Sequence, residues 1–178
     1  NQLFTSLRVN GRIYDFGGQV VYLNKGFRLN WGASLSHIPY RSSRIFYEQD
    51  TINDVGVTNL AMETLRTFED QLSIFSHYPL SKKVRIEGGV SATRYGYMRT
   101  RINNYYYQGI RIDREEEQVE APDPFYLYQA RAAYVGDDSY FGLTSPLRGS
   151  RYRFQLERTL GRYSFFTGLM DYRRYYFI

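Results

Sequence analysis

Few residues in this sequence belong to the types that commonly carry out catalysis. The chain of 178 residues has two histidines and no cysteine, which excludes a disulfide scaffold, a thiolate metal site and a cysteine nucleophile. His37 and His77 lie beside Pro39 and Tyr78 without the spacing of a metal-binding motif, and we interpret them as ordinary interface or turn histidines. A Ser-His-Asp triad assembled across strands leaves no local motif, so an enzyme acting on lipid or peptide stays an alternative.

Two short runs are candidates for binding. The acidic run 115–117 follows Arg111 and Arg114 and suits a divalent ion or the basic patch of a partner, although a solvated loop explains the same residues. The tyrosines at 105–107 could stack on a sugar or a base, but we favour an aromatic rim on an outer loop as their explanation. We predict no catalytic residue, no metal site and no cofactor.

The composition indicates one folded domain that is rich in aromatic residues. The net charge is +5, 43% of the residues are hydrophobic and 18% are aromatic, whereas a disordered chain is depleted in such residues. No run approaches the ~20 apolar residues of a membrane-spanning helix. The arginines recur at alternate positions inside apolar segments instead of forming one basic patch, and this distribution argues against a nucleic-acid partner.

This alternation is the main structural signal in the chain. In residues 84–93, Val84, Ile86, Val90 and Ala92 share one parity, and charged or hydroxyl residues take the other. The same split recurs in the segments 7–13, 27–36 and 151–157. A period of two residues predicts β-strands with one apolar and one polar face. A soluble β-sandwich or lipocalin-like barrel also alternates, so this fold stays an alternative.

Three further features favour an antiparallel, up-and-down transmembrane β-barrel in a bacterial outer membrane. The predicted strands have roughly a dozen residues, longer than the average soluble strand and close to the 9–11 residues of a tilted membrane crossing. Charged side chains occupy the middle of the polar face, as in a filled barrel lumen. Tyrosine and phenylalanine gather near the strand ends, where amphipathic rings suit the lipid interfaces.

We predict eight strands, at 4–15, 18–24, 27–38, 60–77, 83–102, 125–136, 150–158 and 164–177. The two long links, 39–59 and 103–124, both fall at odd positions in the order of links, so they lie on the same side of an up-and-down barrel. In the fourth strand, the parity of Phe68 and Leu72 also sends Asp70 to the apolar face, which is costly in lipid. We therefore expect a β-bulge at 69–71, or a position of Asp70 near the rim.

The parity assigns residues to each face of the predicted barrel. The expected lumen-facing ionic network consists of Arg8, Arg12, Arg28, Arg85, Arg131, Arg151, Arg153 and Arg173 with Glu63, Glu69, Glu87, Glu157 and Asp171. A charged eyelet that selects anions is a functional version of the same network. The expected lipid-facing residues are Val9, Leu29, Trp31, Val84, Ile86, Val90, Phe154 and Leu156.

Three stretches resemble one family. They are Tyr78-Pro79-Leu80-Ser81-Lys82-Lys83-Val84-Arg85-Ile86-Glu87-Gly88-Gly89-Val90, Ser145-Pro146-Leu147-Arg148-Gly149-Ser150-Arg151-Tyr152-Arg153-Phe154 and Asp171-Tyr172-Arg173-Arg174-Tyr175-Tyr176. The first and third are similar to a turn with its strand and to a later strand of BamA/TamA-type barrels, the bacterial surface-antigen superfamily. The second is similar to the family's S-P-x-R-G-x-R-x-R segment, so Pro146, Arg148 and Gly149 would form a periplasmic turn motif. The similarity covers about the last hundred residues and is closest to members joined to a TolB-like propeller.

The resemblance implies a sixteen-stranded barrel of which this chain forms strands three to ten. It also implies a role as structural anchor or conduit for a periplasmic or surface protein, without chemistry of its own. A passive porin is a further alternative. The long inward-facing Arg and Glu side chains look too bulky for an eight-stranded lumen. We therefore expect residues 1–178 to be a single region of a larger barrel, completed by further sequence or by another chain.

Overall fold

The computed structural model describes residues 1–9, 15–52, 55–141 and 146–176. Eight strands follow one another in the order β1-β2-β3-β4-β5-β7-β9-β10, each antiparallel to the next, while β6 pairs with β5 and β8 with β9. The bounds are β1 Gln2–Val9, β2 Phe16–Asn24, β3 Asn30–Ile52, β4 Val55–Pro79, β5 Val84–Tyr107, β6 Ile110–Val119, β7 Phe125–Asp137, β8 Tyr140–Phe141, β9 Pro146–Gly161 and β10 Phe165–Tyr175.

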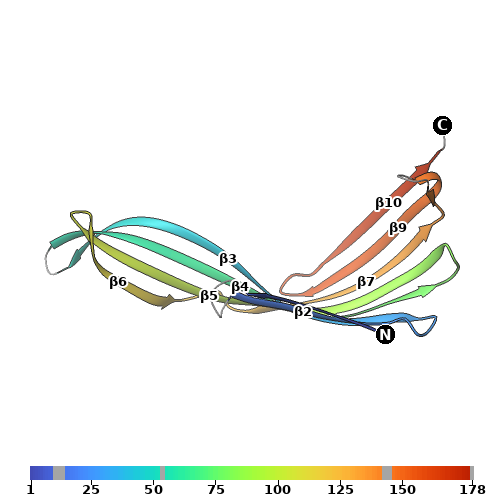
Figure 1. Ribbon diagram of the computed structural model, residues 1–178, viewed down its shortest axis with the longest axis horizontal. Helices are drawn as coiled ribbons and strands as arrows, with labels where there is room; N and C mark the ends of the chain where they lie inside the picture. The colour runs from blue at the N-terminus through green and yellow to red at the C-terminus, as the bar shows by residue number, and fades with distance from the viewer. Residues whose placement is uncertain (10–14, 53–54, 142–145, 177–178) are drawn as a thin grey trace.

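The sheet is curled into an open half-barrel (Figure 1). In the described part of the chain, β1 pairs only with β2 and β10 only with β9, so these two strands are the edges of the sheet. Successive strands of this path are antiparallel neighbours, and β6 and β8 lie outside the path. The prediction of an all-β, antiparallel, up-and-down fold of the barrel class is therefore confirmed.

The sheet has two regions of different width, to which we give separate names. The wall comprises β1, β2, β7, β9 and β10 with residues 30–37 of β3, 70–79 of β4 and 84–95 of β5. The extension comprises residues 38–52 of β3, 55–69 of β4 and 96–107 of β5, together with β6. In Figure 1 the extension reaches away from the wall to the left, beyond the turn between β9 and β10.

The extension corrects the prediction of long loops at 39–59 and 103–124. Residues 39–52 instead extend β3 and pair with residues 55–68 of β4, so that Ile45 faces Met62 and Tyr47 faces Leu60. In the second segment the chain turns at Gln108 and Gly109, whose φ angles are 49° and 82°. Two central residues with positive φ fit the twist of a two-residue hairpin loop. The β-branched and aromatic residues of both segments favour strands over loops.

Other predicted boundaries also change. The register of β4 against β3 and β5 is continuous through residues 69–71, so the predicted bulge is wrong. β1 ends at Val9 within the described residues, and residues 27–29 form a bend before β3. β9 begins at Pro146 instead of at residue 150, so the supposed turn motif lies in a strand. Gly149 has a φ of 113° there, and an added Cβ would meet the carbonyl oxygen of Asp138, so glycine is required.

Few apolar side chains are buried, because a single sheet has no second layer to cover it. In the extension the buried apolar residues are Val57, Ala61, Ile102 and Tyr105. In the wall they are Ala133 and Val135. Most large apolar side chains of the wall stay exposed, and their position decides what the fold can do.

Candidate functional site: the two faces of the wall

The strand register sorts the wall residues into an apolar and a polar face. On the apolar face, Ile74 pairs with Val90 and then Ala130, and Ile86 pairs with Tyr134 and then Phe154. Val90 and Leu156 are 57% and 58% exposed. The wall thus presents its largest apolar side chains to its surroundings instead of packing them into a core.

The polar face carries side-chain hydrogen bonds between each pair of neighbouring strands from β4 to β9 along the sheet. Gln71 of β4 donates to the Thr93 hydroxyl at 3.2 Å, and Ser91 of β5 donates to Gln129 of β7 at 3.1 Å. Gln129 in turn donates to Glu157 of β9 at 3.4 Å. These contacts satisfy polar groups within the sheet, so this face is organised by hydrogen bonds.

Ion pairs extend this organisation toward the end of the wall with the short turns. Glu87 of β5 forms ion pairs with Arg85 at 2.7 Å and with Arg153 of β9 at 2.9 Å. Arg153 reaches Glu87 across β7, whose residues Ala133 and Val135 on this face are only 7% and 8% exposed. Side chains converge in this way on the inner surface of a curved sheet. The polar face is therefore the concave face of the half-barrel, and the apolar face is convex.

The register places most of the sequence-predicted residues on the two faces as two separate sets. On the polar face lie Arg8, Arg85, Glu87, Arg131, Arg151, Arg153, Glu157, Asp171 and Arg173. On the apolar face lie Val9, Trp31, Val84, Ile86, Val90, Phe154 and Leu156. Arg12 lies outside the described residues.

Two predicted residues lie on neither strand face. Arg28 and Leu29 belong to the bend between β2 and β3. The Arg28 guanidinium donates to the carbonyl oxygen of Pro79 at 3.3 Å and lies 4.9 Å from the centre of the Tyr78 ring. Arg28 therefore ties two adjacent turns together, and its assignment to a strand face was wrong.

The polar-face residues form several local clusters instead of one network. Arg173 binds Asp171 at 2.9 Å within β10, and Arg151 binds Asp137 at 3.2 Å across β9 and β7. Asp137 was missing from the predicted set. The hydroxyl and backbone N–H of Ser139 also donate to Asp137, and these hydrogen bonds lower the pKa of its carboxyl group against the opposing effect of burial.

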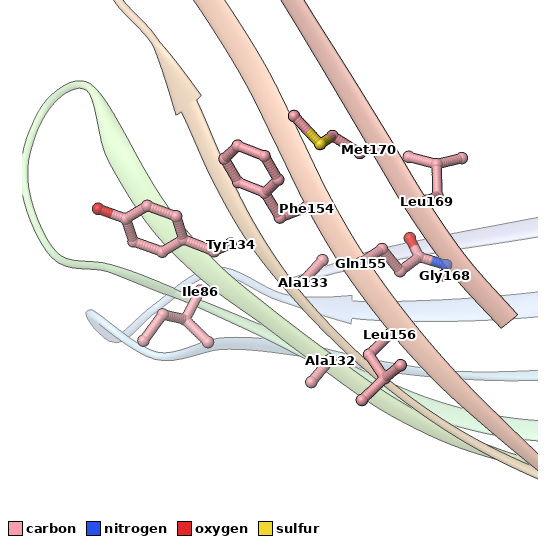
Figure 2. Close-up of a pocket in the computed structure, with 10 residues that line it drawn as sticks. All are labelled: Ile86, Ala132, Ala133, Tyr134, Phe154, Gln155, Leu156, Gly168, Leu169 and Met170. Atoms are coloured by element: carbon pink, nitrogen blue, oxygen red, sulfur yellow. The ribbon is translucent and has the colours of Figure 1, made fainter. Parts of the chain in front are cut away.

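A shallow hollow marks the middle of the apolar face (Figure 2). Its volume is about 570 Å³. It is lined by Ile86, Ala132, Ala133, Tyr134, Phe154, Gln155, Leu156, Gly168, Leu169 and Met170. Figure 2 shows Ala132 beside Leu156 and Phe154 beside Met170, and the register places Ala132, Leu156 and Gly168 in one row. The small side chains leave a hollow with a mostly apolar lining, in which Gln155 and Tyr134 are the polar residues.

Sequence reasoning missed a charged cluster on the apolar face. Asp70 pairs with His37 of β3 on one side and with Arg94 of β5 on the other. One carboxylate oxygen of Asp70 lies 2.5 Å from His37 Nδ1, and the other accepts from Arg94 Nη1 at 3.2 Å. The His37 ring stacks on Phe16 and Phe68. These partners explain how a carboxylate is tolerated here without a bulge. Each of the three residues has the parity of the apolar residues in its own strand, and this was the signal available in the sequence.

The extension is held together by polar contacts of its own. Arg66 donates to Asp15 at 3.1 Å, and the two side chains are only 3% and 9% exposed. Asn59 Nδ2 donates to Asn103 Oδ1 at 3.2 Å. Burial and the nearby carboxylate of Glu115 raise the pKa of the Tyr105 phenol. The extension therefore buries charge and amides, unlike the wall.

Within the described ranges, no group of three or more His, Asp or Glu residues is placed to hold a metal ion. The run 115–117 lies in β6 instead of the alternative solvated loop. Among these residues, no helix is long and apolar enough to span a membrane.

Comparison with known proteins adds no identity. The chain matches no protein-family model, no curated protein and no solved structure. The features of the chain that bear on its function are therefore the apolar and the polar face of the wall.

Proposed function

We propose that this chain is part of a bacterial outer-membrane β-barrel that acts as a structural anchor or conduit and performs no chemistry of its own. One observation carries the proposal: the wall exposes a broad apolar band on its convex face and gathers hydrogen bonds and ion pairs on its concave face. Lipid would cover the first face, and a water-filled or side-chain-filled lumen would adjoin the second.

The height of the band supports a membrane crossing. On β5 the apolar-face positions run from Val84 to Arg94. Ten steps of about 3.3 Å along a strand tilted by about 40° rise about 25 Å, the height of the apolar band of outer-membrane barrels. Tyrosines lie near both ends of this span: Tyr126 and Tyr128 at one end, and Tyr134 and Tyr172 at the other. Such placement suits the two lipid interfaces.

A soluble sandwich is the less favoured reading because nothing in the described chain covers the band. A second sheet would have to pack on the apolar face at a distance of about 10 Å. The described strands instead form one path, with β6 and β8 added beside β5 and β9. Soluble monomers rarely expose apolar patches larger than a few hundred Å².

The unpaired edges of β1 and β10 add a requirement. Open strand edges are not tolerated in the hydrocarbon core, because each unpaired N–H and C=O group lacks water there. We infer that strands outside residues 1–178, or strands of another chain, pair with both edges. The resemblance to BamA/TamA-type barrels favours a closed barrel of sixteen strands, and a periplasmic or surface protein as partner.

Heat modifiability tests the proposal. The full-length protein would be solubilised in detergent and run on a gel with and without boiling, because a closed barrel resists unfolding in detergent at room temperature. We expect a mobility shift on boiling and recovery of the protein in the outer-membrane fraction. Recovery in the soluble fraction without a mobility shift would overturn the proposal. Single-channel recording then separates an anchor from a conduit, since only a conduit or porin gives steady conductance.

A further inference from the structure

The His37, Asp70 and Arg94 cluster lies at one end of the apolar band. The row below it on the same face contains Leu35, Leu72 and Ala92. The row above contains Pro39, Phe68 and Gly96, where the extension begins. If the wall spans a membrane, this cluster lies at the height of the lipid headgroups.

Each oxygen of the Asp70 carboxylate has one hydrogen-bond partner in the cluster. One oxygen of Asp70 is taken by His37 and the other by Arg94, and the three side chains are 38%, 38% and 46% exposed. In the described part of the chain, the second ring nitrogen of His37 and the remaining guanidinium nitrogens of Arg94 have no hydrogen-bond partner. Two nitrogen-bearing side chains thus keep unused hydrogen-bonding groups on a half-exposed surface.

Both side chains are held in place. The ring centroid of His37 lies 5.8 Å from that of Phe68 and 6.5 Å from that of Phe16, with near-parallel planes. The Arg94 guanidinium lies beside Gly96, where an added Cβ would come within 3.3 Å of Nη1. Because Gly96 has no side chain, it leaves the space that the Arg94 guanidinium occupies. A preorganised group loses little entropy when it binds an anion.

We propose that Arg94 and His37 bind the phosphate of a phospholipid headgroup, with Asp70 positioning both side chains. The inference rests on the proposed membrane location of the wall. A planar guanidinium donates paired hydrogen bonds to phosphate oxygens, and such charge-assisted bonds are stronger than neutral ones. The apolar rows directly below the cluster would contact the acyl chains of the same lipid. A free phosphate has no acyl chain and would lack that second contact.

Native mass spectrometry of the full-length protein tests this site. The protein would be released from detergent micelles that contain either phosphatidylglycerol or diacylglycerol, which lacks phosphate. We expect retained phosphatidylglycerol to exceed retained diacylglycerol at least threefold. Inorganic phosphate at millimolar concentration should not displace the lipid. Equal retention of the two lipids, or full displacement by inorganic phosphate, would overturn the proposal.

A double substitution separates binding from folding. Arg94→Gln alone leaves Asp70 uncompensated, so we pair it with Asp70→Asn, which removes the stranded charge. The matched control is Arg173→Gln with Asp171→Asn, which removes an ion pair of the same two residue types on the polar face. We expect the apolar-face double variant to retain at least threefold less phosphatidylglycerol and the control to retain the wild-type amount. Equal losses would show that this site does not hold the lipid.

The same samples distinguish the two proposals from each other. If the wild type and both double variants shift on boiling but the apolar-face variant retains wild-type lipid, the headgroup site is wrong and the barrel stands. If the wild type is soluble and shows no shift, the membrane location fails and the site fails with it.

Discussion

The wall and the extension continue the same strands but use opposite means of stabilisation. In the wall the convex face exposes Val90 and Leu156, whereas on its continuation in the extension the Arg66 side chain is buried in an ion pair with Asp15, the residue that precedes β2. The charges divide in the same way. Residues 38–69 and 96–124 contain eleven Asp and Glu against seven Arg, and the rest of the chain contains seven Asp and Glu against sixteen Lys and Arg.

This difference indicates that the two regions suit different surroundings. A surface with exposed apolar rows is stable where lipid replaces water, because no apolar area then faces water. A hairpin whose side chains form ion pairs and amide hydrogen bonds is stable in water. One continuous strand such as β4 can therefore pass from lipid to an aqueous space near Asp70, where the character of its convex face changes.

The largest expected effect comes from charge on the convex face of the wall. Val90→Arg or Phe154→Arg should block insertion, because an arginine at the bilayer midplane costs roughly 2–4 kcal/mol. Ser91→Arg and Gln155→Arg, each one residue away on the concave face, should insert. Tyr47→Arg, at a 79% exposed position of the extension, should also insert. Heat modifiability measures all five, and equal tolerance everywhere would remove the distinction between the two regions.

The buried ion pair of the extension should give the next largest effect. Arg66→Met leaves Asp15 buried without its partner, and loss of one partner of a buried pair costs about 3–5 kcal/mol. We expect faster hydrogen exchange in β3 and β4 above residue 38, with the wall unchanged. Adding Asp15→Asn should restore much of the protection. If protection falls equally in β7 and β9, the extension and the wall are one cooperative unit.

The smallest expected effect concerns Asp137 at the turn end of the wall. Its pKa is lowered in the folded protein by Ser139 and Arg151. A lowered carboxyl pKa stabilises the fold above the unfolded-state pKa, and this contribution disappears as the pH falls through the folded-state value. Asp137→Asn should therefore reduce unfolding resistance in urea at pH 7 and leave it unchanged in strong acid. A deficit of the same size at both pH values would refute this assignment.

The wall was predictable from sequence because its alternation is regular. In residues 84–93 charged and hydroxyl residues alternate with apolar ones, and this parity predicts the face on which each residue lies. The extension was not predicted, since segments 39–59 and 103–124 mix Pro, Ser, Asn and charged residues on both faces. The contact between Arg66 and Asp15 joins residues 51 apart in the chain, which no local pattern encodes.

The chain contains a single tryptophan, so the membrane location of the wall can be measured directly by depth-dependent quenching with brominated lipids. Trp31 lies on the convex face near the turn end of the wall and should be quenched most by bromines near the headgroups. After Trp31→Phe, Val90→Trp should be quenched most by bromines deep in the acyl chains, and Ser91→Trp should respond weakly to lipid bromine. Accessibility of all three tryptophans to aqueous iodide, without quenching by any brominated lipid, would contradict the account.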